Sequence, residues 1–302
     1  MINYLIEMRY SYVLWLLFLS SALSCQPTTT WKNADTFEAG IATGEVSDVI
    51  NEASGLVASR NNIGGLWTHN DSGGNPNLYL IDEMGTLRWT VRIEGIENRD
   101  WEDIAIGAGP KAGKNYLYIG EIGDNNAVHN KKYLYRIEEP FLNLSFSNKD
   151  TIITEVDQLE FIYPDGLRDA ETVLISPTNS IFYIISKREP SVRIYMGSTA
   201  ITQPQELKKV GSLPLTQLVS GDISMDGREV LLKNYDEIYY WRMGDTTTTF
   251  VNWITEKNPK QLVYVREPQG ESIAWKTDGS GYFTLSEKEK TQPTLLYFYK
   301  RK

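Results

Sequence analysis

The chain has 302 residues, with 39 acidic and 30 basic side chains, so its formal net charge is −9. An acidic balance of this size excludes the basic face that nucleic-acid binding needs, and we expect no nucleic-acid partner. The same balance disfavours attachment to anionic lipid by charge alone. Only one cysteine is present, which excludes an internal disulfide and a site built from several thiolates.

The N-terminal segment predicts export. An apolar run over residues 13–23 has the length of a signal-peptide core and is too short to span a bilayer. It ends in Ala22-Leu23-Ser24 directly before Cys25, which resembles a relaxed form of the lipobox of bacterial lipoproteins. The resemblance implies a lipoprotein signal peptide over residues 1–24, a lipid on Cys25 and a tether over residues 25–35. An ordinary cleaved signal is the alternative.

These features predict a protein of the bacterial cell envelope, anchored to a membrane through lipid at Cys25 and facing the periplasm or the exterior. We expect it to be a monomer. The start codon is open between Met1 and Met8, and Arg9 favours Met8, because signal peptides begin with a positively charged region.

Beyond the tether, short apolar and aromatic runs alternate with turns rich in Gly, Asn, Asp and Pro. The 18 Tyr and 8 Trp residues suit pleated, half-buried surfaces. Many short strands at this spacing predict one all-β domain over residues 36–302, built as a sandwich, a barrel or a propeller.

A weak repeat favours the propeller. Each unit begins with an acidic residue ahead of a small or apolar strand, and a second strand follows after a turn. The spacings are 50, 69, 51 and 49 residues, and the acidic residues are Glu52, Glu102, Glu171, Asp222 and Glu271. A period near 50 with several strands per unit matches propeller blades. We therefore predict a single five-bladed β-propeller, closed by an outer strand from residues 36–49. Six blades and a β-sandwich are the alternatives.

The innermost strands of a propeller line its channel, so the acidic residues of the repeat are expected at the channel mouth. Carboxylates that converge in this way raise each other's pKa unless a cation neutralises them, and oxygen ligands from several strands suit calcium. The predicted metal ligands are Glu52, Glu102, Asp103, Asp169, Glu171, Asp222 and Glu271. Alternatively, these acids cap the inner strands by binding backbone amides or nearby basic side chains, the candidates being Arg99, Arg168 and Lys233.

The second strands end in polar residues that we expect on one face of the ring. This predicted binding face consists of Asn70, Glu121, Ser186, Lys187, Asn234 and Ser286. Two long turns supply candidates for positioning a catalytic water, namely Asp71, His69 and Asp124. Ordinary turn chemistry is the alternative for these residues. His69 and His129 are the only histidines and show no zinc-binding spacing.

Three motifs carry a family resemblance: Asn70-Asp71-Ser72-Gly73-Gly74, Asp100-Trp101-Glu102-Asp103-Ile104-Ala105 and Gly123-Asp124-Asn125. They resemble a group of secreted bacterial β-propeller proteins of largely uncharacterised function. The match is good over residues 52–140 and implies fold and location, with no reaction attached. More distantly, the ring of acids is similar to calcium-dependent nucleotidases and to phosphotriesterase- or lactonase-like propellers.

Two functions follow from these patterns. The first is a cell-envelope module whose propeller face binds a ligand or protein partner, with calcium stabilising the channel. The alternative is a calcium-dependent hydrolase of an ester, lactone or phosphoester, with its site at the channel mouth.

Overall fold

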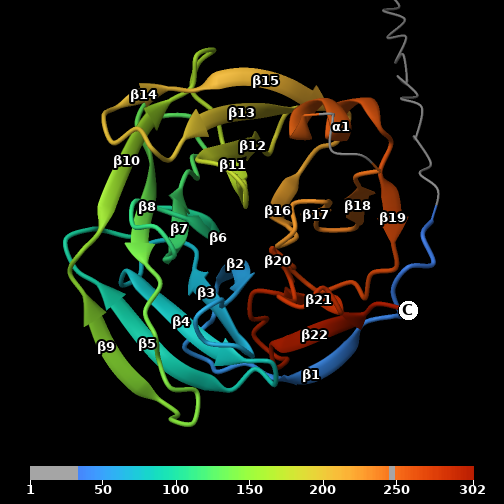
Figure 1. The fold of residues 1–302 in the computed structure, drawn as a ribbon. Coiled ribbons are helices and arrows are strands. Elements are labelled where there is room, and N and C mark those ends of the chain that lie inside the picture. Colours follow the sequence, from blue (N-terminus) through green and yellow to red (C-terminus); the bar gives the residue numbers. More distant parts are fainter. Residues whose placement is uncertain (1–32, 245–248) are drawn as a thin grey trace, which may run out of the picture. The chain divides into compact units, whose positions relative to one another are not determined.

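The computed structural model describes residues 33–244 and 249–302, which form five small sheets arranged in a ring (Figure 1). Each inner strand contacts the inner strands of both neighbouring sheets, which closes the ring around its central axis, the position of the predicted channel. This arrangement confirms the five-bladed propeller over the sandwich and the six-bladed alternative. The inner strands are β2 (Ala53–Ala58), β6 (Trp101–Ala108), β11 (Ala170–Ile175), β16 (Leu218–Ile223) and β20 (Ser272–Trp275).

Blades 1 and 2 account for the long step in the repeat. The remaining strands of blade 1 are β3 (Gly65–Asn70), β4 (Asn77–Asp82), β5 (Leu87–Ile93) and β9 (Lys149–Ile153). Those of blade 2 are β7 (Asn115–Glu121), β8 (Lys132–Glu138), β10 (Asp157–Ile162) and β14 (Gln205–Glu206). After β8 the chain returns to blade 1, where β9 pairs in parallel with β5, before β10 pairs with β8 in blade 2. The extra residues therefore form this return strand, not a sixth blade.

Blades 3 and 4 are regular antiparallel sheets of four strands each. Blade 3 continues through β12 (Ile181–Ser186), β13 (Val192–Ser198) and β15 (Lys208–Leu213). Blade 4 continues through β17 (Glu229–Asn234), β18 (Ile238–Arg242) and β19 (Lys260–Leu262), and the short helix α1 (Phe250–Glu256) lies between β18 and β19 in the chain. Thr249 caps this helix by accepting a hydrogen bond from the Asn252 amide.

Blade 5 joins the two ends of the domain. It contains β21 (Gly281–Leu285), β22 (Leu295–Lys300) and, as its outer strand, β1 (Ile41–Glu45). β1 pairs antiparallel with β22, and Phe37 forms a further bridge to Arg301. The predicted closing strand from residues 36–49 is thus confirmed, and it leaves β22 without an open edge.

The core of the described structure consists of five apolar clusters, each between two neighbouring blades. A blade is therefore covered on both faces, which explains why strands such as β12, Ile-Phe-Tyr-Ile-Ile-Ser, are continuously apolar. Large aromatic side chains fill these interfaces, and Trp67 and Trp101 are fully buried between blades 1 and 2.

The predicted signal peptide over residues 1–24, the predicted lipidation site Cys25 and the tether as far as residue 32 lie outside the described residues. In the described parts of the chain, no helix has the length and apolar character that a membrane span requires.

Candidate functional site

Four of the five acidic residues of the repeat lie at the N-terminal ends of inner strands. Glu102 and Glu171 are the second residues of β6 and β11, and Glu52 and Glu271 directly precede β2 and β20. The structure brings Glu102 and Glu171 together at one mouth of the channel, within one group of carboxylates.

Asp222 is the exception, and its predicted alignment with the strand heads is wrong. It is the fifth residue of β16, at the far end of the strand, where its Oδ2 accepts the Trp275 amide at 2.8 Å. Burial raises its pKa to about 7, although Arg60 favours the charged form. In β11, a register irregularity leaves Glu171 without a directly paired residue on β12. β16 has the same irregularity, and there Val219 takes the position equivalent to Glu171.

Asp103 lies inside the channel wall and ties three blades together. Its Oδ1 accepts the hydroxyl of Ser220 on β16 at 3.1 Å, and its Oδ2 accepts the amide of Val173 on β11 at 2.9 Å. The side chain is fully buried, and this burial raises its pKa well above the ordinary value. Its contacts are those of a cross-link between inner strands.

Two groups of three carboxylates lie at the mouth, and Glu102 belongs to both. In each group, one carboxylate oxygen per residue lies within 4.8 Å of the others. The outer triad, Asp71, Asp100 and Glu102, contains two partly exposed residues, whereas all three members of the inner triad, Glu102, Asp169 and Glu171, are buried. Either spacing suits a cation between oxygen ligands.

The inner triad already has cationic partners. Lys187 donates a hydrogen bond to Oε1 of Glu171, and Nε of Arg188 donates to Oδ2 of Asp169 at 2.6 Å. Oδ1 of Asp169 accepts the amide of Asp124 at 2.8 Å. Two basic side chains therefore offset the charges of this triad.

The basic side chains expected to pair with the acidic repeat have other partners. Arg99 lies 3.2 Å from Glu121, Arg168 pairs with Asp165 and Glu189, and Lys233 donates to backbone carbonyls. Pairing by basic residues does occur, but through Lys187 and Arg188, which follow the second strand of blade 3.

The outer triad has no such partners. Within residues 33–244 and 249–302, no donor forms a hydrogen bond with the carboxylates of Asp71, Asp100 or Glu102, and no basic group forms an ion pair with them. Glu102 is only 3% exposed, and Oδ1 of Asp71 is buried without a partner. A buried carboxylate without a hydrogen-bond or ionic partner is unfavourable in its charged form.

The pKa shifts reflect this repulsion. Burial raises the pKa of Asp71 to about 7, and the nearby Asp100 adds to the rise. Burial and the neighbouring carboxylates also raise the pKa of Glu102 well above its ordinary value, and burial raises that of Asp100. A bound divalent cation would remove the repulsion and favour the charged forms.

Glu121 positions the Asp100 loop. Its carboxylate accepts the Arg99 amide at 3.0 Å and the Asp100 amide at 2.9 Å, just before β6 begins. The Trp101 amide donates to the Asp71 carbonyl at 3.1 Å, so the two loops that carry the outer triad are joined directly. The side chains of Asp71 and Asp100 therefore approach each other from adjacent blades.

Gly123 makes room for the triad. A Cβ at this position would overlap Oε1 of Glu102 and lie 2.5 Å from Oδ2 of Asp100. Its amide donates to the Asp100 carbonyl at 3.2 Å. The Gly-Asp-Asn motif thus has a steric reason for its glycine, since only a residue without a side chain lets both carboxylates lie here.

Glu271 and Glu52 lie outside both triads. Glu271 accepts the Tyr235 hydroxyl at 2.6 Å, and that hydroxyl accepts a hydrogen bond from Lys187 at 2.9 Å. Burial, reinforced by Glu271, raises the pKa of Glu287 to about 8. These residues form a second layer of carboxyl groups around the triads.

The residues of the predicted binding face occupy equivalent positions at the ends of the second strands. Asn70, Glu121, Ser186 and Asn234 each lie opposite the first residue of an inner strand, and Ser286 directly follows β21. Their side chains bind loop backbones, as when Ser186 accepts the Arg193 amide at 2.9 Å. Lys187, the sixth member, points into the inner triad.

Asp124 and His69 are engaged in the fold. The two oxygens of Asp124 accept the amides of Val128 and His129, each at 2.8 Å, and Lys132 lies 3.2 Å from Oδ2. Despite burial, these donors hold the pKa of Asp124 below its ordinary value. His69 is fully buried beside Trp101, and its Nδ1 donates to the Asn70 carbonyl at 3.0 Å.

Burial lowers the pKa of His69 to about 4, against 6.5 for an exposed histidine. Between these pH values the unfolded chain binds a proton that the folded protein does not, so the free energy of unfolding falls as the pH drops from 6.5 to 4. The full loss is about 3 kcal/mol. We expect His69→Gln to remove this part of the acid dependence in urea denaturation, whereas His129→Gln retains it. Equal acid slopes in native and His69→Gln proteins would contradict the neutral buried ring.

No protein-family model and no curated protein matches the chain. The fold and the site therefore define the class of protein. It is a five-bladed β-propeller with a carboxylate triad, unpaired among the described residues, at one mouth of its channel. Sequence reasoning missed Asp100 as a member of this group and assigned Asp71 to water positioning. The acidic motif Asp100-Trp101-Glu102 was the available signal, since two of its acids converge on one site.

Proposed function

We propose that the propeller is a calcium-dependent binding module of the cell envelope. Asp71, Asp100 and Glu102 hold the ion at the channel mouth, and an oxygen-bearing group of the ligand completes its coordination. The supporting observation is the outer triad itself, in which three carboxylates, one of them 97% buried, lack any hydrogen-bond or ionic partner among the described residues. The lipid anchor at Cys25, proposed from the sequence, would hold the module at a membrane.

The chemistry of the donor set favours calcium. All three side chains offer hard carboxylate oxygens, and calcium tolerates the irregular geometry of ligands from two loops and a strand. Magnesium demands nearly ideal octahedral geometry and gives up its water reluctantly. The partly exposed Asp71 and Asp100 leave one side of the triad accessible to a ligand.

A calcium-dependent hydrolase is the second candidate, favoured by Lys187 beside the carboxylates. A cation and an ammonium group at one mouth are suited to polarising an anionic ester. Against it, His69 is buried and Asp124 is fully hydrogen-bonded, so neither is available to activate water. Turnover of an ester, lactone or phosphoester that stops in Asp71→Asn would decide for the hydrolase.

The proposal predicts a calcium-specific rise in melting temperature. An ion that binds only the folded state at a hundredfold excess over its Kd adds about 2.7 kcal/mol to the free energy of unfolding. For a domain of this size, the melting temperature should rise by about 5–10 °C. The measurement is thermal unfolding after EDTA treatment, with calcium or magnesium then added.

Asp100→Asn is expected to abolish most of this rise. Asp150→Asn is the matched control. Asp150 is exposed on β9, a strand of blade 1 that lies far from the triad. No calcium-dependent shift in the native protein, or an equal shift in Asp100→Asn, would overturn the proposal.

A further inference from the structure

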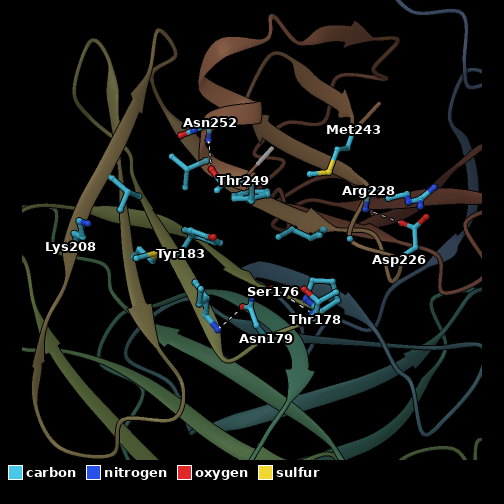
Figure 2. A pocket seen from close by; sticks show the side chains of 18 of the residues that line it. Ser176, Thr178, Asn179, Tyr183, Lys208, Asp226, Arg228, Met243, Thr249 and Asn252 are labelled. Carbon is cyan, nitrogen blue, oxygen red and sulfur yellow. Dashed lines mark hydrogen bonds between the residues drawn. The ribbon is translucent and has the colours of Figure 1, made fainter. Parts of the chain in front are cut away.

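A cavity of about 920 Å³ lies between blades 3 and 4, at the end of the inner strands opposite to the triads (Figure 2). Its floor is formed by two turns, residues 176–179 after β11 and residues 226–228 after β16. These turns touch, since a Cβ at Gly227 would lie 3.1 Å from Cγ of Pro177. α1 covers β15 on the outer side, where a Cβ at Gly211 would lie 3.3 Å from Val251.

The walls are apolar and only partly covered. Ile181, Met196, Val210 and Phe250 are partly buried side chains that line the cavity and pack against the cluster between the two blades. Tyr183 lies among them, with its ring centroid 4.7 Å from that of Phe250. Apolar side chains gathered around a hollow favour an occupant with an apolar body.

The rim carries positive charge on a chain whose net charge is negative. Figure 2 shows Lys208 on one side of the cavity and Arg228 on the other. Over the described ranges, neither side chain forms an ion pair, whereas Lys209 lies 3.6 Å from Asp165. The acidic residue at the rim, Asp226, forms its hydrogen bonds within its own turn.

The Asp226 carboxylate accepts the Ser224 hydroxyl at 2.6 Å and the Arg228 amide at 3.0 Å. These donors lower its pKa even though partial burial acts to raise it. The charge of Asp226 is thus held within the turn, and Lys208 and Arg228 line the cavity from opposite sides.

We propose that this cavity binds a small organic anion with an apolar body, whose acidic group lies between Lys208 and Arg228. A volume near 900 Å³ is in the range of ordinary ligand sites and accommodates a molecule of drug-like size. The site is independent of the cation at the channel mouth, because none of its lining residues belongs to either triad.

The test uses two fluorescent probes with the same aromatic body. Anilinonaphthalene sulfonate carries a negative charge and phenylnaphthylamine carries none. Titrated into the folded protein, the sulfonate should bind saturably at one site and about tenfold more tightly than the neutral probe. Met196→Trp, which fills the cavity, should weaken both probes at least tenfold. Lys208→Glu with Arg228→Glu should weaken only the sulfonate.

Lys300→Glu is the charge control, because Lys300 is exposed on β22, outside the cavity. Each variant is checked for an unchanged melting temperature, since partly unfolded protein also binds such dyes. If Met196→Trp disturbs the fold, Val210→Phe replaces it. Unsaturable binding, equal affinity for the two probes, or sulfonate binding unchanged by the double substitution would each overturn the proposal.

Discussion

Glu102→Gln is expected to unfold at a higher temperature than the native protein in EDTA and to lose most of its response to calcium. The substitution keeps the shape of the side chain and replaces a buried carboxyl group, which forms no hydrogen bond or ion pair with the described residues, with a neutral amide. Burial raises the pKa of Glu102 well above its ordinary value, so folding of the calcium-free protein carries a cost that the amide does not incur. The variant should therefore be more stable by about 1–3 kcal/mol, which corresponds to a rise of several degrees. With calcium present, the native protein should become the more stable of the two.

The matched comparison is Glu171→Gln, at the same position of the next inner strand. Glu171 pairs with the buried Lys187, so its neutralisation leaves an ammonium group without its counter-charge and should destabilise the protein. Its calcium response should largely remain, since Glu171 is not part of the outer triad. If Glu102→Gln were less stable than the native protein in EDTA, the outer triad could not be a site of unpaired charge.

Gly44→Ala is expected to cause a large loss of stability. Gly44 lies in β1, where a Cβ would overlap the carbonyl oxygen of Met84 in the turn between β4 and β5. Because the obstacle is backbone, no side-chain rotation relieves it, and either β1 or the turn must move. We expect the free energy of unfolding to fall by about 3 kcal/mol, measured by urea denaturation.

Gly74→Ala controls for the general effect of placing alanine at a glycine. No atom lies within 4 Å of the added Cβ, and its backbone is outside the left-handed region. This variant should be as stable as the native protein or slightly more so. Similar losses in the two variants would show that the close approach of β1 to blade 1 does not stabilise the ring.

The fold was predictable because the residues that mark each blade lie close together in the sequence. The second strand of each blade, β3, β7, β12, β17 or β21, is a short run rich in apolar and aromatic residues and follows the inner strand after a turn, as the repeat predicts. The predicted alignment of the repeat is wrong at Asp222, because an acid followed by apolar residues also occurs at the far end of β16. Because the strands are short and one contains a bulge, the sequence alone does not determine how the residues of different inner strands align.

The outer triad was only partly predictable, because its members come from two loops and a strand that meet in space. Glu102 follows from the repeat, whereas Asp71 and Asp100 are loop residues outside the strand pattern. Their approach depends on the Trp101 amide binding the Asp71 carbonyl and on Glu121 holding the Asp100 loop. Which carboxylates have basic partners depends on Lys187 and Arg188, and no spacing along the chain indicates this.

The closing strand has a consequence for how the protein is made. β1 is synthesised among the first elements of the domain and β22 last, and the Thr43 hydroxyl bonds the Leu296 carbonyl across 253 residues of sequence. β1 therefore has no partner until the last strand of the chain has been made. A chain truncated before β22 leaves β1 unpaired and the outer edge of β21 open. Such incomplete molecules therefore have an exposed strand edge that can pair with other chains, and the full-length protein lacks it.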